Sequence, residues 1–116
     1  MAAEIQIGGP GTGRTVYVII RNRIGQAWSL SGPAFEDYVA ASVANYAISA
    51  TEQGANNYYA ATMPTAIPAG VYNISAHQQI GGSVAQSDTR IAMGTEHWNG
   101  SVMLPLSDLT TSGQLG

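Results

Sequence analysis

The sequence predicts an all-β fold, a single antiparallel sandwich or barrel-like domain of about seven short strands with at most one short helix. β-branched and aromatic residues gather in short runs, and Gly, Pro and Asn separate these runs. The sequence contains no repeat with a period of about 20–50 residues, so a solenoid is not expected. The chain has 116 residues, the length of one domain. We interpret residues 1–14 as an N-terminal arm, 15–106 as the β domain and 107–116 as a C-terminal tail.

The first predicted strand, residues 15–21, has apolar side chains on both faces. Alternation places Val16, Val18 and Ile20 on one face and Tyr17 and Ile19 on the other. This pattern is typical of a covered, central strand. We expect residues 24–30 to pair with it as a hairpin.

A helix is expected only between Ser31 and Tyr46. Aromatic and Val residues recur there at helical spacing, with Ser31 placed as a cap and Pro33 near a first turn. A short helix near residues 33–45 and an irregular crossover both fit this pattern.

Turn-forming residues then separate the remaining predicted strands, which cover residues 46–51, 58–63, 71–79, 90–98 and 101–105. In the third of these, Tyr72, Ile74 and Ala76 form the apolar face. Tyr58 and Tyr59 are consecutive and point to opposite faces, so we expect at least one of them in the core.

Charged residues are scarce: 9% of the chain, with four cations, all Arg, against seven acids. Nucleic-acid binding is not expected, because it needs a strongly basic surface. The sequence has no run of about 18 apolar residues and no apolar segment near its start, so we expect neither a membrane span nor an export signal. The absence of cysteine excludes disulfides, thiolate metal sites and cysteine nucleophiles.

The segment GGPGTGRT, Gly8 to Thr15, matches the phosphate-binding P-loop pattern except that Arg14 stands where Lys is required. That motif works between a strand and a helix, whose N-terminus helps to hold the phosphates. Here the β-branched run VYVII follows and predicts a strand. We therefore expect no nucleotide to bind.

No set of residues indicates a reaction, so we predict no enzyme, no metal and no cofactor. Glu96 and His97 are adjacent and face opposite sides of a strand, and we interpret His77 and His97 as solvent-facing. The adjacent carboxylates Glu36 and Asp37 are expected to cap or solvate a turn.

Four aromatic residues could stack on sugars or bases: Trp28, Tyr58, Tyr59 and Trp98. Base stacking is normally combined with a positive groove, which this composition does not supply, so carbohydrate binding remains as the alternative. Polarity from amides, hydroxyls and glycine suits large hydrogen-bonded contacts between proteins.

A resemblance is carried by the segments TVYVIIRNRIGQAW (15–28), AFEDY (34–38), YAISATEQG (46–54), YYAATMPTAIPAGVYNISAHQQIGGS (58–83) and HWNGS (97–101). Together they resemble a small β-rich module of virion-associated proteins of tailed bacteriophages. The ending LPLSDLTTSGQL resembles the linker to further β-rich segments in longer relatives. The resemblance covers residues 15–115, implies a structural role in the virion and transfers no catalytic residues.

The implied function is that of a capsid decoration or cement subunit, made in the host cytoplasm, which binds the major capsid protein and stabilises the particle. An anchoring module of a head or tail fibre or baseplate is one alternative, and a carbohydrate-binding or hydrolytic domain is another. We expect a homo-oligomer, a trimer on the three-fold sites of an icosahedral shell, whose arms reach a neighbour. The expected contact residues are Ile5, Ile7, Pro10, Arg14, Tyr59, Trp98, Leu109 and Leu115.

Overall fold

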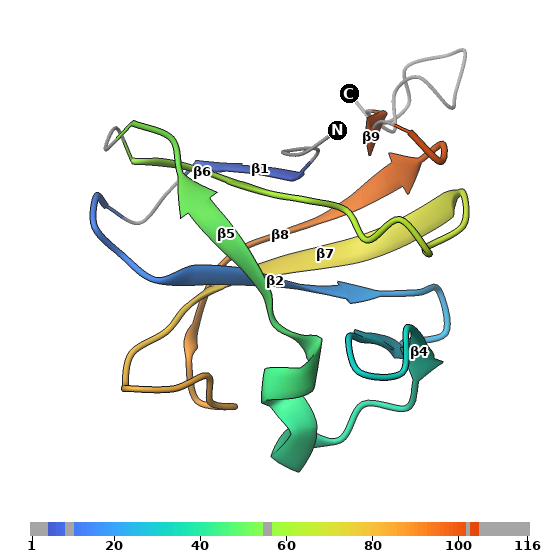
Figure 1. Cartoon of the computed structure of the whole chain (residues 1–116), viewed down its shortest axis with the longest axis horizontal. Coiled ribbons are helices and arrows are strands. Elements are labelled where there is room, and N and C mark those ends of the chain that lie inside the picture. Colours follow the sequence, from blue (N-terminus) through green and yellow to red (C-terminus); the bar gives the residue numbers. More distant parts are fainter. Residues whose placement is uncertain (1–4, 9–10, 55–56, 102, 105–116) are drawn as a thin grey trace.

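The computed structural model describes residues 5–8, 11–54, 57–101 and 103–104. In this part of the chain, one curled antiparallel sheet of nine strands forms a half-barrel, with one 3-10 helix beside it (Figure 1). The prediction of an all-β fold with a single short helix is confirmed. The strands are β1 (Ile5–Gly8), β2 (Val16–Arg21), β3 (Ala27–Ser29), β4 (Ala34–Glu36), β5 (Ile48–Glu52), β6 (Tyr58–Ala61), β7 (Gly70–Gln78), β8 (Thr89–Trp98) and β9 (Met103–Leu104).

The strands follow one another across the sheet in the order β1-β6-β5-β2-β7-β8-β9. The short strand β3 pairs with the end of β2 at Arg21 and Ala27, and β4 pairs with β3. The predicted hairpin between residues 15–21 and 24–30 is therefore confirmed. Each strand pair is antiparallel, so neighbouring strands alternate in direction across the whole sheet.

Strand β2 is central and covered on both faces, as its sequence predicts. It pairs with β5 on one side and with β7 on the other. Val16, Val18 and Ile20 belong to the main core inside the curl, whereas Tyr17 and Ile19 belong to a second apolar cluster on the opposite face. The 3-10 helix η1 (Ala40–Tyr46) covers that second cluster with Val43 and Tyr46.

The ambiguous segment between residues 31 and 46 contains both a strand and a helix. The helix begins at Ala40, later than the predicted residue 33, because residues 34–36 form β4. Phe35 explains this difference. Its ring lies 5.1 Å from that of Trp28 and 5.5 Å from that of Tyr72, contacts that hold the segment extended along the sheet.

The expectation of a free N-terminal arm is corrected at residues 5–8. These residues form β1, which pairs with β6 from Ile5 opposite Ala61 to Gly8 opposite Tyr58. Ile5 and Ile7 are each only 5% exposed and contribute to the main core. The predicted C-terminal tail lies outside the described residues.

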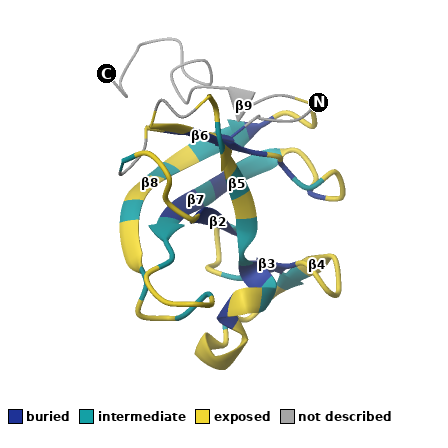
Figure 2. Cartoon of the chain, turned by 60° about the vertical axis from the view of Figure 1, so that its left-hand side comes forward, coloured by how far each residue is buried: buried dark blue, intermediate teal, exposed yellow. Residues whose placement is uncertain are grey.

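Buried residues concentrate on β2 and β7, and the turns and the outer part of β8 are exposed (Figure 2). The predicted apolar face of β7 is confirmed, since Tyr72, Ile74 and Ala76 are all buried. Tyr59 is 1% exposed and Tyr58 is 38% exposed, which confirms that the two consecutive rings lie on opposite faces.

Candidate functional site

A cleft of about 420 Å³ opens between β1 and β8. Among the described residues, β1 pairs with β6 only, and β8 pairs with β9 only at His97 and Trp98, so no ladder joins β1 to β8 (Figure 1). The lining comes from three strands: Ile5, Gln6, Ile7, Gly8, Ile74, Ala76, Ala92, Met93, Gly94 and Glu96. The curled sheet is thus open along one seam.

The cleft is mainly apolar. Ile74 and Ala76 are buried in β7, whereas Ala92, which pairs with Ala76 in β8, is exposed. Glu96 is the one ionisable residue in the lining, and burial raises the pKa of its carboxyl. The inner face of β8 is therefore uncovered at Ala92, whereas its partner on β7, Ala76, is packed in the core.

A second surface feature is the turn between β2 and β3. Ile24 at this turn is 78% exposed, the largest exposed fraction among the exposed large apolar residues of the described chain. It lies beside a shallow cleft of about 300 Å³, lined by Asn22, Arg23, Ile24, Gly70, Val71 and Tyr72. The two apolar features of the surface are therefore separate, one at the open seam and one at this turn.

The turn that carries Ile24 is held by Asn22. Its side-chain oxygen accepts hydrogen bonds from the N–H of Ile24 at 3.1 Å and of Gln26 at 2.9 Å. The N–H of Gly25 donates to the carbonyl of Asn22 at 3.0 Å, and Gly25 adopts a φ of 87° that a residue with a side chain rarely takes. Ile24 is consequently presented to solvent on a rigid turn.

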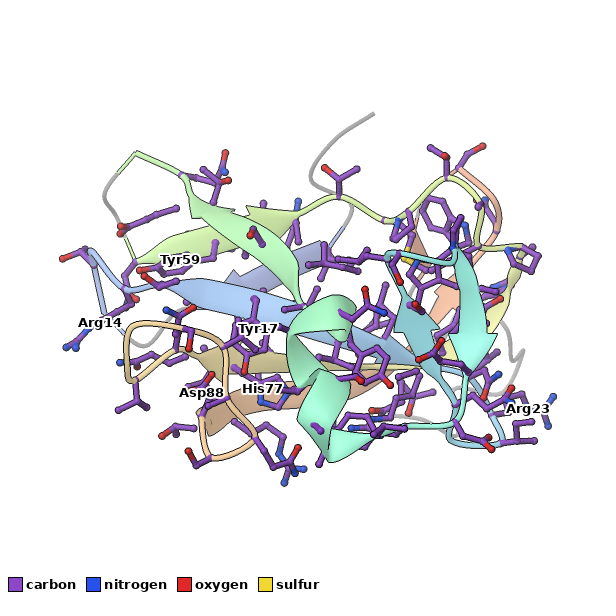
Figure 3. The ribbon with its side chains drawn as sticks, turned by 60° about the horizontal axis from the view of Figure 1, so that its bottom comes forward. Arg14, Tyr17, Arg23, Tyr59, His77 and Asp88 are labelled. Atoms are coloured by element: carbon purple, nitrogen blue, oxygen red, sulfur yellow. The ribbon has the colours of Figure 1, made fainter. Side chains whose placement is uncertain are left out.

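Three N–H groups of the glycine-rich segment before β2 donate hydrogen bonds to side chains of the protein. Gly11 donates to Asn57 Oδ1 at 2.5 Å, Gly13 to Glu52 Oε1 at 2.8 Å and Arg14 to the Tyr59 hydroxyl at 3.0 Å. The expected context is confirmed, because the segment leads into strand β2 and not into a helix. Arg14 is exposed at the edge of the molecule (Figure 3).

Tyr17, His77 and Asp88 form a cluster that joins β2 and β7 to the loop before β8 (Figure 3). The Tyr17 hydroxyl donates to Asp88 Oδ2 at 2.7 Å, and the Tyr17 ring stacks on His77 with centroids 5.2 Å apart. Asp88 also accepts hydrogen bonds from the N–H groups of Ile80 and Ala85. The carboxylate therefore organises the loop.

Burial and neighbouring charges shift the pKa values in this cluster. Burial, with the adjacent Asp88 carboxylate, raises the pKa of Tyr17. Burial lowers the pKa of His77, and the cations Arg21 and Arg90 add to this effect. Burial by itself would raise the pKa of Asp88. The pKa is nevertheless held below its usual value by hydrogen bonds from the Ala85 N–H, the Tyr17 hydroxyl and the Ile80 N–H.

The two histidines are not solvent-facing as predicted, because both are half-buried in the sheet. His77 packs on Tyr17, and the Nδ1 of His97 is buried without a hydrogen-bond partner.

Glu96 faces the cleft between β1 and β8. Among the described residues, no group of three or more His, Asp or Glu side chains is placed to hold a metal ion. Glu36 accepts a hydrogen bond from the Tyr46 hydroxyl at 3.1 Å.

Most of the expected contact residues that the structure describes lie in the core. Ile5, Ile7, Tyr59 and Trp98 are between 1% and 5% exposed, and Trp98 donates through Nε1 to the carbonyl of Ile67 at 3.1 Å. Their packing inside the curled sheet corrects the expectation that they face a partner. Arg14 is exposed as expected. Pro10, Leu109 and Leu115 lie outside the described residues.

Three of the four rings considered for sugar stacking are core residues. Trp28, Tyr59 and Trp98 are at most 3% exposed, and the hydroxyl of the exposed Tyr58 donates to Gln6 Oε1 at 2.6 Å. These rings do not form a shared exposed face. Sequence reasoning missed Ile24 and, in the lining of the seam, Ala92, Met93 and Gly94. The small residues Ala92 and Gly94 in a predicted strand were the available signal for the seam.

No protein-family model, curated protein or solved structure matches the chain. In the described part of the chain, no helix has the length and apolar character needed to span a membrane.

Proposed function

We propose that this chain is a structural protein of a bacteriophage particle, a decoration or cement subunit that binds the lattice of the major capsid protein. The sequence resemblance over residues 15–115 suggests the class of particle. Ile24, exposed on a rigid turn beside an apolar cleft, is the observation that carries the proposed contact with another protein.

A single exposed apolar side chain is common on proteins and carries little information by itself. Ile24 differs from an ordinary exposed side chain because the turn that carries it is held in place by the Asn22 side chain and by the conformation of Gly25. A preorganised apolar group loses little conformational entropy when it enters a pocket, so more of its burial contributes to affinity. The shallow cleft beside it, lined by Val71 and Tyr72, extends the same apolar surface.

The composition supports this kind of contact. With 9% charged residues, the chain has few groups whose desolvation would oppose a large interface. The proposal includes a homo-oligomer, a trimer, because icosahedral shells offer three-fold sites. The virion is the corresponding location.

The number of copies per purified particle tests the proposal, measured by quantitative mass spectrometry. A decoration subunit is expected at a copy number on the order of hundreds per particle. About a dozen copies or fewer would instead indicate the anchoring module of a fibre or baseplate, and absence from the particle would contradict a virion role.

Replacement of Ile24 tests the contact itself. We expect Ile24→Asp to abolish retention on particles while leaving the melting temperature nearly unchanged, because the side chain is already in solvent. The matched control is Ile80→Asp, since Ile80 is 63% exposed in a different loop. Equal loss of retention in both variants would contradict a specific role of the turn.

A further inference from the structure

We propose that the cleft between β1 and β8 binds a small cationic amphiphile, a primary ammonium ion that carries an apolar alkyl chain. Glu96 receives the ammonium group, and the apolar lining of the cleft covers the chain. The inference is independent of the proposed function, because it concerns a different surface from the turn that carries Ile24.

The cleft has the size and the character of a small-molecule site. β7 contributes the buried residues Ile74 and Ala76 to its lining, and β1 contributes the buried Ile5 and Ile7. Its volume of about 420 Å³ lies within the range of about 300–1,000 Å³ that is usual for such sites. Sites of this kind are mostly apolar and use a few polar groups to orient the ligand, which is the role left to Glu96 here.

Small residues on β8 leave space beside the Glu96 carboxyl. Residues that are directly opposite in an antiparallel pair lie on the same face of the sheet, so Ala92 and Gly94 share the inner face with Ala76 and Ile74. Glu96 follows on this face, two residues after Gly94. The apolar part of a ligand therefore has room directly next to the carboxyl.

The position of the carboxyl depends on Gly94. A Cβ atom at residue 94 would lie 3.3 Å from Glu96 Oε2, which is closer than ordinary van der Waals contact. The carboxyl therefore lies against the backbone of Gly94, within the lining of the cleft, and a side chain at residue 94 would push it away.

Within the described part of the chain, the Glu96 carboxyl has neither a hydrogen-bond partner nor an ion-pair partner. Arg90, the cation of β8, pairs with His77, whose ring stacks on Tyr17 at the opposite face of the sheet. Burial raises the pKa of Glu96, because the carboxylate loses water without gaining a counter-charge. A cationic ligand supplies the missing partner.

The charge of Glu96 selects the class of ligand. An ammonium group is compact and donates up to three hydrogen bonds, so it can pair with a single carboxylate at the end of an apolar chain. A fatty acid of the same length would bring a like charge to Glu96, and an alcohol would lack the charge. Amphiphiles of equal length therefore differ in affinity only through their head groups.

Isothermal titration calorimetry of the full chain with octylamine, octan-1-ol and octanoate at neutral pH tests this selection. We expect octylamine, which is protonated at this pH, to bind about tenfold or more tightly than octan-1-ol, because a hydrogen bond to a charged group is worth more than a neutral one. Octanoate should bind more weakly than both. Equal affinities for the amine and the alcohol would overturn the role of Glu96, and no binding of the amine would overturn the site.

Two substitutions of carboxyl groups separate the local effect of Glu96 from that of net charge. Glu96→Gln should remove the preference for octylamine over octan-1-ol. Glu36→Gln removes the same charge from β4, outside the lining of the cleft, and should keep the preference. Equal loss in both variants would contradict a specific role of Glu96.

The location of the ligand is tested by nuclear magnetic resonance of the labelled protein. Octylamine should shift the amide signals of Ala92 and Gly94 and leave those of Arg23 and Ile24, at the second cleft, in place. Ala92→Leu fills the cleft and should weaken the binding of octylamine and octan-1-ol alike. Shifts confined to the second cleft, or undiminished binding to Ala92→Leu, would overturn the proposal.

Discussion

The carboxylate of Glu52 accepts a hydrogen bond from the N–H of Gly13 at 2.8 Å. Its other oxygen accepts a hydrogen bond from the N–H of Asn57 at 2.9 Å. One side chain at the end of β5 thereby ties the glycine-rich segment before β2 to the turn before β6. An anion of the protein itself therefore occupies the N–H of Gly13, one of the backbone donors that a phosphate group would need in this segment.

Nucleotide is expected not to bind at residues 8–15. A ligand at 100 times its dissociation constant would add about 2.7 kcal/mol to the free energy of unfolding. Titration with magnesium and ATP should therefore leave the melting temperature where it is. A clear upward shift would show that the backbone donors are available after all.

Glu52→Ala is expected to lower the free energy of unfolding by about 1 kcal/mol, because the N–H groups of Gly13 and Asn57 lose their acceptor. Glu52→Gln is the conservative comparison, since its amide oxygen can still accept one of the two bonds. Chemical denaturation of the three proteins measures the difference. An unchanged midpoint in the alanine variant would mean that water replaces the carboxylate at no cost.

Stability is expected to fall as pH drops below about 6.5, the ordinary value for histidine, because of His77. Burial and the two nearby arginines lower its pKa in the fold, so the unfolded chain takes up the proton first. The contribution of neutral His77 to the free energy of unfolding is complete above the pKa that His77 has in the unfolded chain. It is lost as pH falls through the lower pKa that His77 has in the fold. His77→Phe keeps a ring against Tyr17 without a titrating group, and its unfolding free energy should depend less on pH in this window. Identical pH profiles for the two proteins would contradict this assignment.

Attachment to particles is expected to be nearly independent of salt. Screening weakens association that depends on charge, and 9% of charged residues provide few pairs to screen. Sedimentation of the free protein should show a trimer, and particles washed at low and high salt should retain equal amounts of it. A monomer that is lost at moderate salt would contradict both expectations.

The sequence predicts those parts of the fold that depend on local alternation. The two faces of β2 and the buried face of β7 follow from side chains two residues apart, and the structure contains both. Strand β1 could not be predicted because its four residues are too few for a periodic signal and are stabilised by pairing with β6, far along the chain. The cleft beside it was missed for the same reason, since it exists only where the curled sheet brings β1 near β8.

The pairing of Ile5 with Ala61 also determines when the sheet can be completed during synthesis. Strand β1 has no partner until β6 has been made, whereas β7 and β8 are separated only by residues 79–88 and can pair as soon as both are made. The apolar side chains of Ile5 and Ile7 therefore lack their partner strand while residues 9–57 are being synthesised. This interval is the one in which a chaperone would protect the chain from association with its neighbours on a polysome.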